Sequence, residues 1–260
     1  MHAISPWLDS CLRDNLDEML TLLEAQTHRR YIKSHLPLSA LPIHDGVKYI
    51  HVARDGRDAC MSYLNHINAY TAAAWSRLDA VADADPALHR PAPRPTRDMR
   101  GFFRQWITPG GTAGAEQMGD GFFEIERSFW AERDRDNLLL VHFNDLKADL
   151  DGEMRRVADF LEIDTPASLW PSLVQAADFE AMKAAGADLM PGAELSFEGG
   201  HATFLNKGVN GRWRDALTAE DLALYQSRVE TELSPDLAAW LEHGRRGAGD
   251  PKAGAGPGGR

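Results

Sequence analysis

Two short runs of apolar residues stand out in a chain whose other apolar residues recur mainly at helical spacing. The first, residues 49–53, reads YIHVA, and the second, residues 137–143, reads NLLLVHF. Strands with apolar side chains on both faces are usual where helices cover a parallel sheet. A tight turn at Asp55 and Gly56 follows the first run, and we expect a helix to open near Asp58, whose carboxylate suits the free N–H groups of a first turn. The pattern predicts an α/β fold with helices on both faces of a parallel sheet.

The segments around these two runs are mostly predicted to be helical. Helices are expected at residues 15–26, 69–84, 122–133, 151–161, 167–177 and 179–184. Thr218, with Asp221 three residues further on, forms a capping box at the start of a later helix. Residues 30–35, RYIKSH, are predicted to form a short strand.

Two stretches are predicted to lack regular structure. Residues 86–97 include four prolines, which fix φ and remove backbone donors. Residues 244–260 are rich in glycine, proline and alanine, and we expect a disordered tail there. No internal repeat is visible, so residues 1–243 are expected to form one domain.

Composition and charge narrow the possible classes of protein. A chain of 260 residues that is 43% hydrophobic can bury a core. The formal charge of −11 argues against a broad nucleic-acid surface, although a local basic pocket could hold a small anion. Cys11 and Cys60 are the only cysteines and the ten histidines show no metal-ligand spacing, so we expect neither disulfides nor a metal. With no leader and no apolar run long enough to cross a bilayer, we expect a cytoplasmic protein without a membrane partner.

Arg54 and Ser62 mark a candidate anion site. Arg54 leaves the first strand at its carboxyl end, where ligands bind in open α/β sheets, and Ser62 lies in the helix that follows. An arginine fork together with a hydroxyl donor suits a phosphate. Taken singly, the two residues could equally be a salt-bridge arginine and an ordinary helix serine.

Lys33 and His35 form a second candidate pair. They are two positions apart, so on an extended chain their side chains point the same way. The histidine could then remove a proton while the lysine holds a developing negative charge. A hydrogen-bonded structural histidine at a strand end is the alternative.

Aromatic residues precede a glycine-rich stretch in the middle of the chain. Phe102, Phe103 and Trp106 are followed by Gly110 and Gly111. These rings could line an apolar pocket for an acceptor substrate, or they could anchor a loop to the core, and we favour the pocket.

Three segments, taken together and in order, point to a known family. Residues 33–37 (KSHLP) match a K-T-H-L-P stretch, residues 52–63 match a strand–turn–helix with an arginine and a serine eight residues later, and residues 204–213 (FLNKGVNGRW) are similar to F-x-R-K-G-x-x-G-x-W. The chain resembles the sulfotransferases of the cytosolic type, in their bacterial branch, which use PAPS (3′-phosphoadenylyl sulfate). Three motifs in register are far more specific than one, and the resemblance covers nearly everything but the tail.

The resemblance implies a reaction and a set of site residues. The implied reaction moves a sulfuryl group from PAPS, as co-substrate, to a hydroxyl or amine of a small-molecule acceptor, without a metal. His35 would be the base and Lys33 would stabilise the leaving group. Asn206 stands where the family usually has an arginine, which removes a charge and a bidentate contact. The residues implied to contact the cofactor are Arg54, Ser62, Phe179, Leu205, Asn206, Lys207 and Gly208.

The same resemblance implies a further strand. The family fold is similar to that of the P-loop hydrolases and has a first, central strand followed by a P-K-[SA]-G-T-T-W loop, which holds the 5′-phosphosulfate. No such string occurs here, so we expect a parallel sheet without that strand, its loop being encoded upstream of Met1 or lost in a shortened paralogue. In the second case the alternative is a non-catalytic protein that binds PAP (adenosine 3′,5′-bisphosphate) or a partner protein. A nucleoside kinase would need a P-loop lysine and a serine hydrolase a G-x-S-x-G motif, and neither is present.

Overall fold

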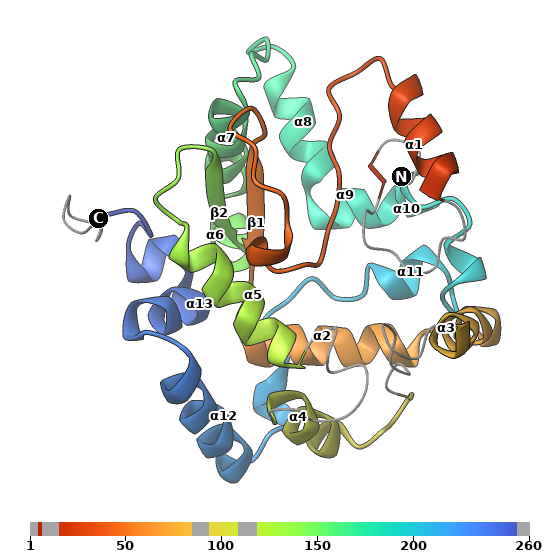
Figure 1. Ribbon diagram of the computed structural model, residues 1–260, viewed down its shortest axis with the longest axis vertical. Coiled ribbons are helices and arrows are strands. Elements are labelled where there is room, and N and C mark those ends of the chain that lie inside the picture. Colours follow the sequence, from red (N-terminus) through yellow and green to blue (C-terminus); the bar gives the residue numbers. More distant parts are fainter. Residues whose placement is uncertain (1–4, 7–15, 85–93, 109–118, 254–260) are drawn as a thin grey trace.

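A two-stranded parallel sheet lies at the centre of the fold (Figure 1). The computed structural model describes residues 5–6, 16–84, 94–108 and 119–253. Strand β1 (Tyr49–Ala53) pairs with β2 (Leu138–His142) in a register that sets Tyr49 beside Leu138 and Ala53 beside His142. Both predicted strands are confirmed, each at the apolar run that predicted it.

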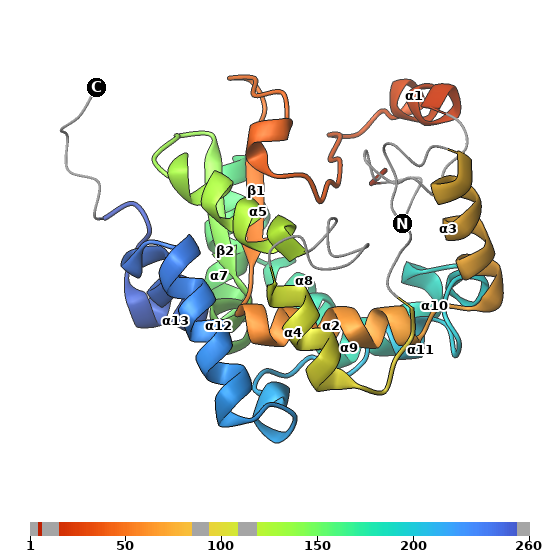
Figure 2. The ribbon, with the colours of Figure 1, turned by 60° about the horizontal axis from the view of Figure 1, so that its bottom comes forward.

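Helices cover the two faces of this sheet unequally. On one face His51 stacks on Phe129 of α5 (Gly119–Ala131) at 4.1 Å between ring centroids, and α13 (Pro235–Ala248) packs beside it. On the other side α7 (Leu150–Leu161) packs against β2, as the views in Figures 1 and 2 show. All of β2 is buried, whereas Ile50 and Val52 of β1 are 37% and 60% exposed. The predicted α/β fold is confirmed, and β1 has β2 as its only partner among the described residues.

Helix α2 (Gly56–Asn68) starts at the carboxyl end of β1. Asp55 caps it by accepting a hydrogen bond from the Arg57 N–H at 2.8 Å. The prediction that a helix opens near Asp58 is confirmed, with Asp58 in its first turn, although its carboxylate accepts from the N–H of the distant Gly211. Gly56 is needed for packing, since a Cβ there would lie 2.6 Å from the hydroxyl oxygen of Tyr225.

The N-terminal part contains α1 (Leu16–Ala25), as predicted, followed by an extended segment and the short helix η1 (Leu38–Ala40). Residues 30–35 do not form the predicted strand. Within this segment only Lys33 pairs with another extended part of the chain: its N–H donates to the carbonyl of Pro6 at 2.9 Å. The segment is anchored at its end by Leu38, whose N–H donates to Ser128 of α5.

The middle of the chain adds α3 (Ala72–Ala84) and α4 (Met99–Ile107). Phe102, Phe103 and Trp106 are 6%, 0% and 3% exposed and belong to the main core. They therefore do not line an acceptor pocket, and the favoured interpretation of these rings is wrong. The glycines that follow, and residues 86–93 of the proline-rich stretch, lie outside the described residues.

Short helices lead from β2 to the C-terminus. They are α6 (Phe143–Ala148), α8 (Trp170–Ala177), α9 (Phe179–Ala184), α10 (Gly186–Leu189), η3 (Ala193–Leu195), α11 (His201–Phe204), η4 (Arg212–Asp215) and α12 (Ala219–Glu232). The capping box of Thr218 and Asp221 at the start of α12 is confirmed.

The C-terminal helix extends into the predicted tail. Helix α13 kinks at Gly244, whose φ of 72° brings the chain against Asp145, and the Asp145 carboxylate accepts hydrogen bonds from the N–H groups of Arg245 and Arg246. Further on, Pro251 is buried and accepts a hydrogen bond from Arg133. The prediction of disorder from residue 244 is therefore wrong for residues 244–253, and residues 254–260 lie outside the described residues.

Candidate functional site

A cleft of about 250 Å³ opens where β1 ends and α2 begins. It is walled by α2, by α9 and by the loop that follows α11. All of the residues predicted to contact a nucleotide line this one cleft, although more than 150 positions separate the first from the last (Arg54 and Gly208). They are Arg54, Ser62, Phe179, Leu205, Asn206, Lys207 and Gly208.

Arg54 is a half-buried cation that has no carboxylate partner among the described residues. Its Nε donates to Asn210 Oδ1 and one Nη donates to the carbonyl of Val209, both at 2.9 Å. The guanidinium also lies over the ring of Phe143, 4.3 Å from its centroid. Burial lowers the pKa of Arg54, and the charge of Asp58 counteracts this. No described carboxylate is within ion-pair distance of Arg54, whereas nearby Arg57 pairs with both Asp55 and Glu242. A cation held only by neutral groups beside a cleft suits an anionic ligand.

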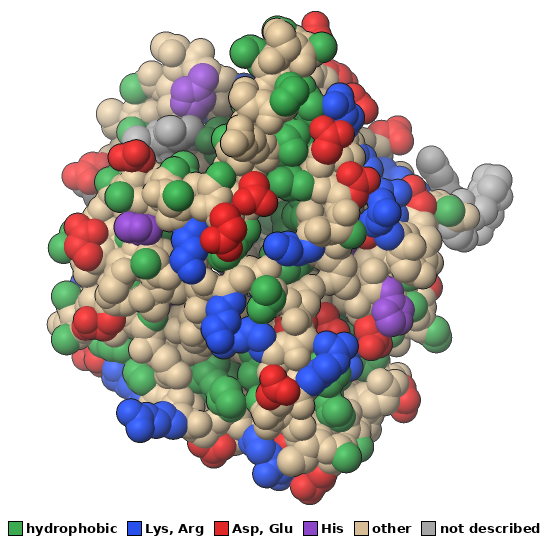
Figure 3. Space-filling view, turned by 180° about the vertical axis from the view of Figure 1, so that it is seen from behind, with side chains coloured by type: hydrophobic (Ala, Val, Ile, Leu, Met, Phe, Trp, Pro, Cys, Tyr) green, Lys and Arg blue, Asp and Glu red, His purple; other side chains and the backbone are tan. Residues whose placement is uncertain are grey.

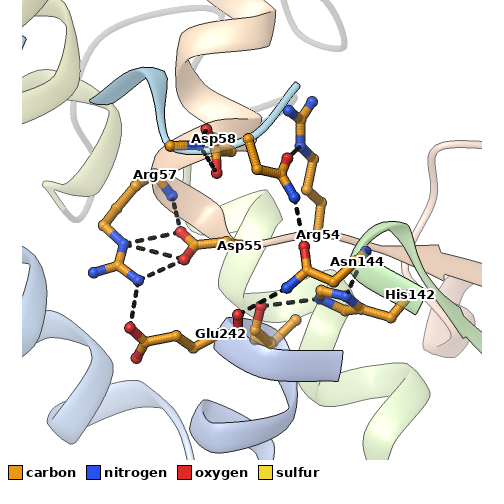
Figure 4. A network of polar contacts seen from close by, with 10 residues as sticks. Arg54, Asp55, Arg57, Asp58, His142, Asn144 and Glu242 are labelled. Atoms are coloured by element: carbon orange, nitrogen blue, oxygen red, sulfur yellow. Dashed lines mark hydrogen bonds and ion pairs between the residues drawn. The ribbon is translucent and has the colours of Figure 1, made fainter. Parts of the chain in front are cut away.

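A chain of hydrogen bonds connects Arg54 to helix α13 (Figure 4). Asn210 donates to Asn144 Oδ1 at 2.5 Å, and Asn144 in turn donates to the carbonyl of Glu242 in α13 at 3.0 Å. The backbone N–H of Asn144 donates to His142, a fully buried ring whose other nitrogen contacts the Leu241 carbonyl. The guanidinium is therefore oriented through side chains that are themselves anchored to the backbone of the last helix.

The loop of residues 205–211 has a defined shape at the cleft. Gly208 has a φ of 59°, and a Cβ there would lie only 2.7 Å from the ring of Phe179. Gly211 has a φ of 82°, and its N–H donates to both oxygens of Asp58, at 2.9 and 3.0 Å. Lys183 of α9 donates to the Asn206 carbonyl at 2.9 Å. Glycine at 208 thus lets the loop lie directly on an aromatic ring.

The far end of the cleft is aromatic. His66, one turn after Ser62 on α2, contacts the Tyr70 hydroxyl at 2.9 Å and packs edge-on against Phe197 and Phe204. The pKa of His66 is lowered to about 4, chiefly by burial and in addition by the charges of His35 and Lys33. The ring is therefore neutral at pH 7.

Lys33 and His35 lie in the exposed segment between α1 and η1, not among the residues that line the cleft. Their charges lower the pKa of His66, which lines the cleft. The structure thus gathers the predicted nucleotide residues into one cleft, and the predicted catalytic pair is not part of its lining.

The surface around the cleft carries further positive charge. Figure 3 shows several Lys and Arg side chains, together with Asp and Glu side chains, around a hollow near the centre of the back face. Besides Arg54 and Lys207, Arg212 lines the cleft. Sequence reasoning missed Arg212, because it occupies a variable position of the 204–213 motif. The part of the chain that the structure describes has no group of His, Cys, Asp and Glu that could hold a metal ion.

Comparison with known proteins identifies the family. The family model of the sulfotransferase domain matches residues 1–236. The chain belongs to the sulfotransferase family. It is thus a transferase, and sulfuryl transfer is the class of reaction that its relatives share. The predicted family is confirmed.

Two mycobacterial relatives match nearly the whole of this sulfotransferase-family chain. The glycolipid sulfotransferase of Mycobacterium bovis (strain BCG / Pasteur 1173P2) is 32% identical over 265 residues, which cover 95% of this chain and 79% of the relative. That of Mycobacterium tuberculosis (strain ATCC 25177 / H37Ra) is 31% identical over 264 residues, with the same coverage.

Solved structures of the family share the fold. A retinol dehydratase in complex with androsterone and the inactive cofactor PAP is 25% identical, with a TM-score of 0.62 over 84% of this chain. This chain spans 57% of that protein. A mouse sulfotransferase complexed with PAP is 17% identical, with a TM-score of 0.64 over 90% of this chain and 75% of its own, and supports the fold alone. No helix in the described ranges is long and apolar enough to span a membrane.

Proposed function

We propose that this chain binds PAPS in the cleft at the end of β1 and transfers its sulfuryl group to a hydroxyl or amine of a small-molecule acceptor. The observation that carries the proposal is that Arg54, which has no carboxylate partner among the described residues, lines the same cleft as Lys207 and the ring of Phe179. A nucleotide that carries a phosphate on its ribose needs cations and an aromatic surface side by side. Two of the solved neighbours were crystallised with PAP, which supports this choice of ligand.

The side chains of the cleft fit the 3′-phosphoadenosine half of PAPS. Arg54 and the Ser62 hydroxyl would donate to the 3′-phosphate from one side, and Lys207 with the Gly208 N–H from the other. Phe179 would carry the adenine. Leu205 and Asn206 would close the loop over the nucleotide, Asn206 without the charge of an arginine.

The predicted catalytic pair would act at the aromatic end. PAPS supplies an activated sulfuryl group, in a displacement closely related to phosphoryl transfer through a loose transition state. His35 would take the proton of the acceptor hydroxyl as the new sulfur–oxygen bond forms. Lys33 would stabilise the bridging oxygen that keeps the electron pair when the old bond breaks and PAP leaves. A positioned base of this kind typically contributes ~10²–10⁴-fold to the rate.

The 5′-phosphosulfate would be held by a further strand and its loop. The edge of β1 opposite β2 has no partner among the described residues, and Ile50 and Val52 beside it are exposed. This leaves room for the additional parallel strand that the family resemblance predicts.

A nucleotide-binding paralogue without catalysis is the second candidate. It is favoured by one observation: the residues that fit the 3′-phosphate are gathered in the cleft without that strand.

Calorimetric titration of the purified chain with PAP and with adenosine 5′-monophosphate tests the nucleotide part of the proposal. PAP should bind at least ~10-fold more tightly, because it alone carries the 3′-phosphate. Arg54→Met should remove this preference, whereas Arg155→Gln, at a surface arginine of α7 that pairs with Asp151, should keep it. Equal binding of the two nucleotides would refute the proposed site.

A transfer assay separates the two candidate functions. PAPS and a simple phenol are incubated with the chain, and sulfated phenol and PAP are measured. Product formation supports the enzyme, whereas tight binding of PAP without product supports the paralogue.

A further inference from the structure

Arg212 brings an unassigned positive charge into the cleft. It is the first residue of η4 and follows Gly211, whose N–H is fixed by Asp58. Its side chain is half-buried and lines the cleft together with that of Arg54. The anchored turn at Gly211 therefore determines where Arg212 enters the cleft.

Within the described residues Arg212 has neither an ion pair nor a side-chain hydrogen bond. Its neighbour Arg214, by contrast, is exposed and stacks on Trp213, 4.5 Å from the ring centroid. Among the described residues Asp58 alone lines the cleft with a carboxylate, and it accepts from the Gly211 N–H. Arg54 and Arg212 line the same cleft; burial chiefly lowers the pKa of Arg54, and the charge of Arg212 acts in the same direction, against the larger effects of Asp58 and Asp55.

Two arginines that line one cleft repel each other, and an anion bound between them would offset that repulsion in addition to the charges of Asp58 and Asp55. A phosphate monoester near pH 7 carries close to two negative charges and can accept from two guanidinium groups at once. Asn206, which lines the same cleft, is neutral and therefore adds no positive charge for a phosphate.

We propose that Arg212 is a ligand of the nucleotide's 3′-phosphate and shares that group with Arg54. The inference rests on the proposed function, since it names a residue of the same nucleotide site. It makes Arg212 a determinant of specificity, because it would act on nucleotides that carry the 3′-phosphate and not on those that lack it.

The test compares Arg212→Gln with Arg214→Gln, which removes an equal charge two residues away and outside the cleft. Affinities for PAP and for adenosine 5′-monophosphate are measured by calorimetry on the full chain. Loss of one charge-assisted contact should weaken PAP binding by ~10- to 100-fold and leave adenosine 5′-monophosphate unchanged. Arg214→Gln should match the wild type for both nucleotides.

A second variant distinguishes loss of the charge from a disturbance of the loop caused by Arg212→Gln. In Asn206→Arg/Arg212→Gln the charge is moved to another position that lines the same cleft, and at least part of the PAP affinity should return. Equal loss for both nucleotides without such rescue would make Arg212 structural and overturn the inference. Wild-type affinity for PAP in Arg212→Gln would overturn it while leaving the proposed function intact. A wild-type chain that does not bind PAP would overturn both.

Discussion

Replacing Gly208 with alanine should displace the ring on which the nucleotide's base is proposed to stack. The new Cβ would lie 2.7 Å from Cδ2 of Phe179 and 2.8 Å from Cε2. Carbon atoms in contact are ~3.5–4.0 Å apart, so the ring or the loop must move by about 1 Å. The φ of 59° adds ~1–2 kcal/mol of backbone strain for a residue with a Cβ.

The two effects of this substitution can be separated by measurement. Stacking of a base on an aromatic ring is worth ~1–3 kcal/mol, so loss of the platform should weaken PAP binding by ~5- to 150-fold. Gly192→Ala is the matched control, because Gly192 has a φ of 79° but its Cβ would meet only Leu195 Cδ1 at 3.7 Å. Urea unfolding should show the loss of stability from φ strain in both variants, with any further loss in Gly208→Ala due to the clash, and calorimetry should show weaker PAP binding in Gly208→Ala alone.

A double variant completes the argument. In Phe179→Ala/Gly208→Ala the clash is gone, so PAP should bind little worse than to Phe179→Ala alone. If Gly208→Ala binds PAP as tightly as the wild type, the contact between the loop and Phe179 does not support the nucleotide, and the reasoning fails.

Three further predictions concern the residues around the cleft. His35→Ala should lower single-turnover sulfuryl transfer by ~10²–10⁴-fold and leave PAP affinity nearly intact; equal turnover would remove His35 from the mechanism. Asn144→Ala cuts the link between Asn210 and α13, so calorimetry should show PAP binding ~2- to 10-fold weaker, and unchanged affinity would mean that Arg54 is oriented without this link. The pKa of His66 is about 4 in the folded chain, below the ordinary value of 6.5, so the unfolded state takes up the proton first as the pH falls. The stability it contributes is complete above pH 6.5 and is lost towards pH 4, at most ~1.4 kcal/mol per pH unit, and urea unfolding of His66→Phe should show a shallower decline over this range than the wild type.

The sequence predicted the parts of the site that depend on local pattern. Both strands are contiguous apolar runs. The expectation that Arg54, Ser62 and Lys207 share one site followed from short motifs that resemble those of the sulfotransferase family. These features are local because a strand end, a turn and a glycine loop are each encoded by a few neighbouring residues.

Features that depend on distant partners could not be predicted in this way. Asp58 is a first-turn residue as predicted, but its carboxylate binds the N–H of Gly211, more than 150 positions away, and no local pattern indicates that partner. The rings of Phe102 and Phe103 would read the same in a pocket wall or in a core. Gly244 looked like the start of a flexible tail, and only its packing against Asp145 shows that it is a kink within a packed helix.

The free edge of β1 has a consequence for how this chain behaves among its own copies. Its N–H and C=O groups on that side have no strand partner among the described residues, and apolar side chains flank them. Such an edge is a template on which an extended segment of another molecule can add by backbone pairing. Self-association through this edge would increase with protein concentration and leave the proposed nucleotide cleft at the carboxyl end of β1 uncovered.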